Sequence, residues 1–314
     1  MEEQQKTQIW AHRGASALQP ENSLAAFALA VELGAEGIEL DVHLTGDNQV
    51  VVCHDMTMKR VSGENLVVGE TNYADLIKVD IACQKRDQLR RLQAEQRVNW
   101  SRTFQEFFRQ TFPDFTYFNP QEYDDFYFQK HWDYFMNTDP AVVYPHMHAP
   151  LLEEVFAMLR PYPVQMNIEL KNRDLIYEGI EDRVIGLANQ FHLQDRVIYS
   201  SFVPKSIEKL QFLDTDSEVG LLYSFPKLFP IRDMIRLKPN AIHPNFSNLL
   251  LPNYVPQAGF FFDCLVNVWT VNNPWIMMRM LKRKVHAIIT DKPDVALTLR
   301  DIYEGGRDKR IFAS

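Results

Sequence analysis

The stretch QIWAHRGASALQPENSLAAFALAVELGAEGIELDV, residues 8–42, decides the fold. Its two ends, residues 8–14 and 37–42, are short apolar runs typical of β-strands, and the segment between them has the apolar spacing of a helix. A strand, a helix and a second strand in this order form the unit of a parallel sheet with crossover helices. The same alternation continues along most of the chain.

Eight apolar, β-rich runs are separated by segments with helical spacing. They are residues 8–14, 37–42, 164–171, 196–202, 218–224, 241–245, 265–272 and 286–291. Eight strands close a (β/α)8 barrel, and a chain of 314 residues is long enough for one large barrel or for two ordinary domains. The sequence therefore predicts an α/β chain folded as a TIM barrel, with its chemistry at the C-terminal ends of the strands.

A ninth run, VVVCHD at residues 50–55, follows the second strand after a turn that is too short for a parallel crossover. We expect it to fold back as an antiparallel hairpin strand. If the turn is centred between Asp47 and Asn48, Asp41 lies opposite His54, and His43 lies opposite Val52. This register would bring a histidine beside an acidic strand end.

The barrel rhythm stops at residues 75–143, which we predict to be a helical, aromatic-rich insertion between barrel segments 1–74 and 144–314. Residues 70–112 contain neither glycine nor proline, which indicates one or two long helices. The insertion begins with a basic part and continues with many aromatic residues. Those rings either pack against the barrel or form a surface for weak contact with a membrane. We expect the insertion to cap the barrel mouth and to narrow the choice of substrate, without supplying catalytic groups.

Composition and charge exclude several classes of protein. Apolar residues make up 46% of the chain, but no stretch approaches the ~20 continuous apolar residues of a membrane-spanning helix. The net charge of -8 argues against nucleic acid as a partner. The three cysteines show no paired spacing, and the first residues lack a signal-peptide pattern, so we expect a reducing cytoplasm.

Three carboxylates are predicted to meet at the barrel mouth. Glu39 and Asp41 lie two residues apart on one strand and so share a face, and Glu169 ends another strand. Their mutual repulsion requires compensation, and an all-oxygen set suits Mg2+, Mn2+ or Ca2+ better than zinc. The alternative is a buried ion-pair network in which Arg13 and Lys171 neutralise these acids.

Two histidines are placed to reach the same mouth. His12 ends the first strand and His54 lies on the hairpin. Histidine is suited to proton transfer near neutral pH, so one could take a proton from the nucleophile while the other donates to the leaving group. Either histidine alone could equally be structural, but beside three carboxylates catalysis is the better interpretation. Trp269 also lies at a strand end, where it could contact substrate or pack in the core.

Residues 11–55 resemble the opening signature of the glycerophosphodiester phosphodiesterase family. A strand ending in HRG is followed by PEN and an AF-containing helix, then by a strand with E-x-D and a hairpin to HD. NIELK at 167–171, VWTVN at 268–272 and IITDKPD at 288–294 stand in the order that this family shows. The resemblance spans the barrel but does not explain residues 80–143.

The resemblance implies a metal-dependent phosphodiesterase on a TIM barrel that cleaves a glycerophosphodiester to glycerol 3-phosphate and an alcohol. It implies that Glu39, Asp41 and Glu169 hold a divalent cation and that His12 and His54 form an acid/base pair. It also implies that Arg13 and Lys171 contact the phosphate and that Trp269 stacks on the substrate.

Three interpretations of function remain open from sequence. The first is hydrolysis of small glycerophosphodiesters, by water or through a cyclic phosphate formed by a substrate hydroxyl. The second is lysophospholipase D chemistry on an acyl-bearing diester. The third is a catalytically silent barrel that binds phosphodiesters or lipid, since the fold alone does not determine function.

Overall fold

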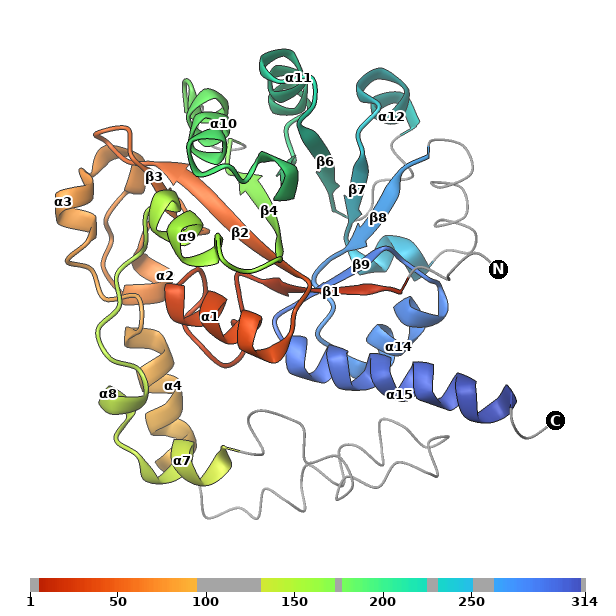
Figure 1. The fold of residues 1–314 in the computed structure, drawn as a ribbon. Helices are drawn as coiled ribbons and strands as arrows, with labels where there is room; N and C mark the ends of the chain where they lie inside the picture. The colour runs from red at the N-terminus through yellow and green to blue at the C-terminus, as the bar shows by residue number, and fades with distance from the viewer. Residues whose placement is uncertain (1–5, 95–130, 173–176, 225–230, 251–262, 312–314) are drawn as a thin grey trace.

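The computed structural model describes residues 6–94, 131–172, 177–224, 231–250 and 263–311. Eight parallel strands form the barrel and a further strand, β3, pairs antiparallel with the C-terminal part of β2 (Figure 1). The strands are β1 (Gln8–His12), β2 (Gly37–Leu44), β3 (Val50–Val52), β4 (Gln165–Leu170), β5 (Val197–Ser201), β6 (Glu218–Tyr223), β7 (Ala241–Pro244), β8 (Leu265–Val268) and β9 (Ala287–Thr290). All eight predicted barrel strands are confirmed.

Helices follow the strands and surround the barrel (Figure 1). The barrel helices are α1 (Leu24–Leu33), α9 (Leu152–Leu159), α10 (Ile180–Phe191), α11 (Pro204–Leu213), α12 (Ile231–Leu237), α14 (Pro274–Lys282) and α15 (Pro293–Ile311). Shorter or inserted helices are α2 (Lys59–Ser62), α3 (Tyr73–Leu76), α4 (Cys83–Ala94), α7 (Trp132–Asn137) and α8 (Pro140–Val143). Helix α1 begins after Ser23, whose side chain accepts the amide N–H of Ala26 as an N-cap.

The barrel closes because β1 pairs in parallel with both β2 and β9. Two register pairs decide where the acidic side chains lie. His12 is opposite Glu39 between β1 and β2, and Asp41 is opposite Glu169 between β2 and β4. Adjacent parallel strands therefore carry the predicted site residues to one end of the barrel.

The barrel interior is packed with side chains, as expected for eight strands. Trp10 is fully buried there against Ile198, Ala287 and Ile289. Its indole ring occupies the space that a side chain at Gly37 would need, since an added Cβ atom would lie 2.4 Å from the ring. Glycine at this position on β2 is therefore required by the close approach of β1.

The hairpin between β2 and β3 forms, but its predicted register is wrong. Val42 pairs with Val52 and His43 pairs with Val51. The turn has three residues rather than an even number: the Thr45 amide donates to the Gln49 carbonyl, which closes the loop from 46 to 48. Residue 48, an asparagine, takes a φ of 61°, which asparagine tolerates better than most residues.

The described part of the insertion contains the predicted helix α4, together with α7 and α8, which lie to one side of the barrel (Figure 1). These helices share a small apolar core. It contains Ala82, Leu89, Phe135, Val143 and Tyr144. Most of the predicted aromatic run falls at residues 95–130, outside the described residues, and the division into two domains stays a prediction.

None of the helices in the described ranges is both long and apolar enough to cross a membrane.

Candidate active site

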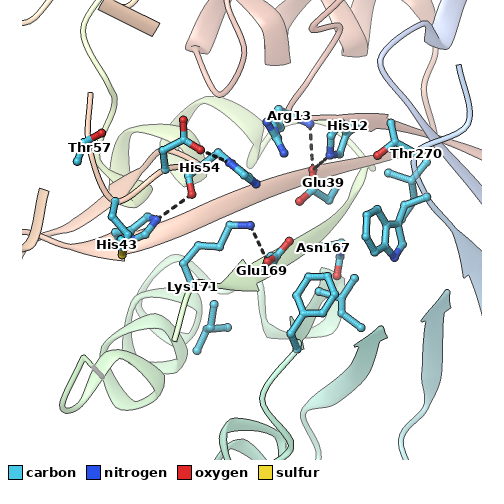
Figure 2. Close-up of a pocket in the computed structure, with 17 residues that line it drawn as sticks. His12, Arg13, Glu39, His43, His54, Thr57, Asn167, Glu169, Lys171 and Thr270 are labelled. Atoms are coloured by element: carbon cyan, nitrogen blue, oxygen red, sulfur yellow. Dashed lines mark hydrogen bonds and ion pairs between the residues drawn. The ribbon is translucent and has the colours of Figure 1, made fainter. Parts of the chain in front are cut away.

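A cavity of about 490 Å³ opens at the C-terminal ends of the barrel strands (Figure 2). It is bordered by every residue of the predicted site except Asp41, which is fully buried beneath it. Its lining has polar and apolar parts. The polar part includes His12, Arg13, Glu39, His54, Asp55, Glu169 and Lys171, and the apolar part, which we call the apolar wall, includes Leu170, Phe202, Leu222, Trp269 and Ile289.

The turn after β1 has unusual backbone geometry. Arg13 and Gly14 both have positive φ, 56° and 79°, and a Cβ atom at Gly14 would lie 2.6 Å from the backbone of Ala26. Only glycine fits that close approach without strain. The turn directs the Arg13 amide at Glu39, donating to both its carbonyl at 2.8 Å and its carboxylate at 3.0 Å. A left-handed arginine at this position is typical of backbone strain held at functional sites.

The three predicted carboxylates converge. Each of Glu39, Asp41 and Glu169 offers an oxygen, and these oxygens all lie within 4.8 Å of one another. Lys171 Nζ lies 2.6 Å from Glu169 and 3.0 Å from Asp41, and Arg13 Nε lies 3.1 Å from Asp41. The ion-pair network considered as an alternative is therefore present around Asp41 and Glu169.

Two cations do not neutralise three buried acids, and the acid pKa values reflect this. Burial, together with the charge of Asp41, raises the pKa of Glu39 well above its ordinary value. Burial also raises the pKa of Glu169, although Lys171 opposes this. Burial disfavours ionisation of Asp41 too, but Lys171 and Arg13 bring its pKa well below the ordinary value. An additional cation would remove the remaining repulsion.

The donor set fits a hard divalent cation. All three side chains are carboxylates, their oxygens face one point, and the open cavity leaves room for water and substrate oxygens. The described residues around the cluster add no thiolate, so zinc is not favoured. The amide of Asn22 fixes Asp41, with Nδ2 donating to Oδ2 at 2.9 Å. Such support of a candidate ligand is typical of metal sites.

His12 is held by the carboxylate of the residue that follows the last strand. Its Nδ1 lies 2.5 Å from Asp291 Oδ1, and its Nε2 lies 3.8 Å from Glu39. Burial opposes ionisation of Asp291, but the contact with His12 lowers its pKa to about 2. Asn272 and Ser16 also donate to this carboxylate. Asp291 therefore fixes the ring so that Nε2 faces the cavity.

His54 has an equivalent partner in its neighbour Asp55, whose Oδ1 lies 2.6 Å from His54 Nδ1. Arg60 Nε donates to the other oxygen of Asp55 at 2.6 Å, and its remaining nitrogens form a fork on Glu21. Glu21 in turn accepts from Arg13. This network ties the His54 side of the site to the arginine at the mouth. Figure 2 shows His54 and His12 on either side of the carboxylates.

His43 belongs to the wall of the cavity but serves as a support. Its Nδ1 lies 2.8 Å from the Tyr177 hydroxyl, and its Nε2 lies 3.0 Å from the His54 carbonyl oxygen. Burial lowers the pKa of His43 to about 4, so the ring is neutral near pH 7. A neutral ring that donates from Nε2 holds the His54 backbone in place.

The apolar wall is built around Trp269. Its indole N–H donates to the His243 carbonyl at 2.7 Å, which fixes the ring, and the edge of Phe202 meets it at a centroid distance of 5.6 Å. Both rings line the same cavity as Glu39 and Glu169. An uncharged part of a ligand would be accommodated on this side.

Sequence reasoning missed the residues that orient the catalytic candidates. Asp291, Asp55 and Asn22 were quoted within motifs, but their contacts were not predicted. Asp291 directly follows the barrel strand β9, which is the signal that could have identified it. His146 and His148 do not border the cavity and lie beside Asp80 and Glu154.

A model of the glycerophosphoryl diester phosphodiesterase family matches residues 12–295. This chain belongs to that family. The match covers every residue of the predicted site and runs from His12 at the end of β1 into α15.

Two curated relatives of this phosphodiesterase family match over nearly the whole chain. A glycerophosphodiester phosphodiesterase of Caldanaerobacter subterraneus subsp. tengcongensis is 29% identical, covering 96% of this chain and 100% of the relative. One of Bacillus altitudinis is 28% identical, covering 94% and 98%. The similarity therefore includes both barrel segments.

Solved structures share the fold. A phosphodiesterase of Oleispira antarctica, in complex with the product sn-glycerol-3-phosphate, superposes with a TM-score of 0.64 at 20% identity, covering 94% of this chain and 97% of that one. The glycerophosphodiester phosphodiesterase of Thermotoga maritima gives 0.62 at 21% identity, covering 93% and 98%. At these identities the comparison establishes the TIM-barrel architecture.

Proposed function

We propose that this chain hydrolyses glycerophosphodiesters to sn-glycerol 3-phosphate and an alcohol, with a divalent cation as cofactor. The observation that carries the proposal is the arrangement at the mouth. A convergent trio of buried carboxylates lies between two histidines, each held by an aspartate, at the edge of a cavity of about 490 Å³. Family membership supports the same reaction.

Glu39, Asp41 and Glu169 are the residues that would hold Mg2+, Mn2+ or Ca2+. A cation there would neutralise charge on the phosphate oxygens and lower the barrier to displacement. Arg13 and Lys171, which border the cavity, would contact the same phosphate. Both already pair with Asp41, so their positions are fixed before substrate arrives.

His12 and His54 would divide the proton transfers. One accepts the proton of the nucleophile, which is water or the neighbouring glycerol hydroxyl, as the new P–O bond forms. The other donates a proton to the departing alkoxide as the P–O bond to the alcohol breaks. Asp291 and Asp55 would keep the rings oriented. Trp269 would pack against the uncharged part of the substrate.

A lysophospholipid is the second candidate substrate. The apolar wall around Phe202 and Trp269 favours it. In addition, a human lysophospholipase D is 41% identical over 78 residues, which cover 24% of this chain and 25% of that protein. For either substrate, we also propose that residues 75–143 cap the barrel mouth and narrow the choice of substrate, and that this insertion makes weak contact with a membrane. We propose a cytoplasmic location for the protein, whichever of the two substrates it hydrolyses.

The test is a product assay on the chelated and reloaded protein. Glycerophosphoethanolamine, glycerophosphocholine and a lysophospholipid are each offered with Mg2+, Mn2+ or Ca2+. The proposal expects cation-dependent release of sn-glycerol 3-phosphate from the first two. Acylated product from the third alone would favour lysophospholipase D. Folded, cation-loaded protein that turns over none of them would overturn the proposal in favour of a binding barrel.

A further inference from the structure

The loop between β1 and α1 is the structural link between the insertion and His12. Ser16 Oγ in this loop lies 2.7 Å from the His12 carbonyl and 3.0 Å from Asp291 Oδ1. The next amide, of Ala17, donates to the Asp291 carbonyl at 3.0 Å. The loop therefore contacts both the side chain and the backbone of the aspartate that orients His12.

Two side chains, one within the insertion and one directly after it, hold this loop. Lys85 on α4 donates from Nζ to the Ala17 carbonyl at 2.8 Å. Tyr144, directly after α8, donates its hydroxyl to the Leu18 carbonyl at 2.7 Å and is 95% buried, with an exposed fraction of 5%. Both backbone polar groups of Ala17 are therefore hydrogen-bonded. Its N–H donates to Asp291 and its carbonyl accepts from Lys85.

The two holding residues are also tied to each other. Arg86, next to Lys85, donates to the Tyr144 carbonyl at 2.9 Å and pairs with Asp80. Tyr144 packs with Phe135 in the small core shared by α4, α7 and α8. Both contacts therefore come from one packed unit rather than from independent surface side chains.

The charged form of Lys85 costs free energy at this position. None of the ion pairs recorded among the described residues includes it, and burial lowers its pKa to about 8, while Asp291 and Glu21 oppose that change. A neutral donor would satisfy the Ala17 carbonyl without this desolvation. What an ammonium adds is a positive field on Asp291 and Glu21, the carboxylates beside His12 and Arg13.

We propose that Lys85 and Tyr144 are positioning residues, through which the insertion holds the β1–α1 loop and, by way of Ser16 and Asp291, the ring of His12. The proposal rests on the function of His12 given above. It assigns the insertion a part in turnover without any contact with substrate. Since displacements of about 1 Å can cost a hundredfold in rate, loss of one support is expected to lower kcat about tenfold.

The variants are Lys85→Met and Tyr144→Phe, with Lys85→Arg as the conservative replacement. Lys78→Met is the matched control, because Lys78 is exposed and pairs only with Asp75 among the described residues. Lys85→Met should lower kcat for a small diester about tenfold with little change in KM, and Lys85→Arg should restore most of it. Tyr144→Phe, which removes only a hydroxyl, should give a smaller loss in the same parameter. Lys78→Met should match the wild type.

Double variants separate positioning from a general structural role. Because Lys85 acts through Asp291, Lys85→Met should add little to Asp291→Asn but should add fully to Asp55→Asn, on the other histidine. Full additivity with both, or unchanged kcat in folded Lys85→Met, would overturn the proposal. Neither result affects the proposed reaction, which is tested by wild-type turnover in the same assay.

Hydrogen exchange tests the loop without turnover. The Ala17 amide is bonded to the Asp291 carbonyl, so it should exchange faster in Lys85→Met and Tyr144→Phe than in the wild type or Lys78→Met. Unchanged exchange at Ala17 in both folded variants would overturn the proposal, even if the wild type hydrolysed no glycerophosphodiester.

Discussion

The protein holds two pairs of histidines in its barrel, and the pairs differ in their partners. At the mouth, His12 and His54 each contact an aspartate and border the cavity. Away from the cavity, His243 and His286 both contact the amide of Asn267, at 3.0 and 2.7 Å, and meet the indole of Trp10 edge-on.

The difference lies in which charge state each environment stabilises. In a catalytic acid or base, a carboxylate partner stabilises the imidazolium that forms during proton transfer, which supports the role proposed for the two mouth histidines. An amide and a tryptophan offer no such charge, and burial lowers the pKa of His243 to about 3. Burial of a histidine is therefore a poor sign of function in this barrel, whereas a carboxylate partner beside an open cavity is a good one.

The largest effect is expected at the carboxylates that give the mouth its charge. Glu39→Ala, Asp41→Ala or Glu169→Ala should reduce turnover to background, because each removes one of few oxygen ligands, and exhaustive EDTA treatment should do the same. The matched control is Glu181→Gln, a buried acid bonded to Asn172, Ser206 and Lys209 away from the cavity. Full activity in chelated protein with verified absence of metal would refute the cation site.

A smaller loss is expected when the partners of the mouth histidines become amides like Asn267. Asp291→Asn and Asp55→Asn should lower kcat about ten- to a hundredfold, as part of the 10²–10⁴ contributed by a positioned acid or base. Circular dichroism checks that each variant is folded. If both variants kept wild-type kcat, the carboxylate partner would not be what distinguishes the two pairs.

The smallest effect on activity is expected for His243→Gln, which should stay within about threefold of the wild type. Its effect is on pH-dependent stability. Because the folded-state pKa is about 3 and the unfolded value is ~6.5, the unfolded state binds the extra proton between these values, and stability falls as pH falls through that window.

Urea unfolding at pH 5 and pH 7 measures the contribution of His243. Each proton that the unfolded state binds and the folded state does not changes the unfolding free energy by about 1.4 kcal/mol per pH unit. His243→Gln should therefore lose less stability than the wild type on going to pH 5, whereas the exposed-site control His146→Gln should lose as much as the wild type. An identical loss in both variants would mean that His243 is not held neutral.

The fold could be predicted from sequence because each strand carries its own signal. The runs at residues 37–42 and 164–171 gave β2 and β4 with bounds within two residues at each end. The meeting of Glu39, Asp41 and Glu169 could also be predicted, because parallel strands bring their C-terminal ends together. The predicted hairpin register was wrong because the length of the turn leaves no hydrophobic pattern in the sequence. A difference of one residue in that length shifts every pair between β2 and β3.

Contacts between distant segments could not be predicted. His12 and Asp291 are 279 residues apart and meet only because β1 pairs with β9. Lys85 lies in a basic stretch where nothing marks it among its neighbours, and its bond to Ala17 depends on how α4 packs. Such pairs depend on tertiary packing, which cannot be inferred residue by residue from a single sequence.

The most direct test of the account is the leaving-group dependence of His12→Ala and His54→Ala. Each folded, cation-loaded variant is assayed with a glycerophosphodiester of an alkyl alcohol and with a p-nitrophenyl diester, whose departing phenolate needs no proton. We expect losses of about 10²–10⁴ in kcat for both variants on the alkyl substrate, and rescue by the nitrophenyl substrate in one variant alone. Equal losses on both substrates in both variants would contradict a division of acid and base between the two mouth histidines.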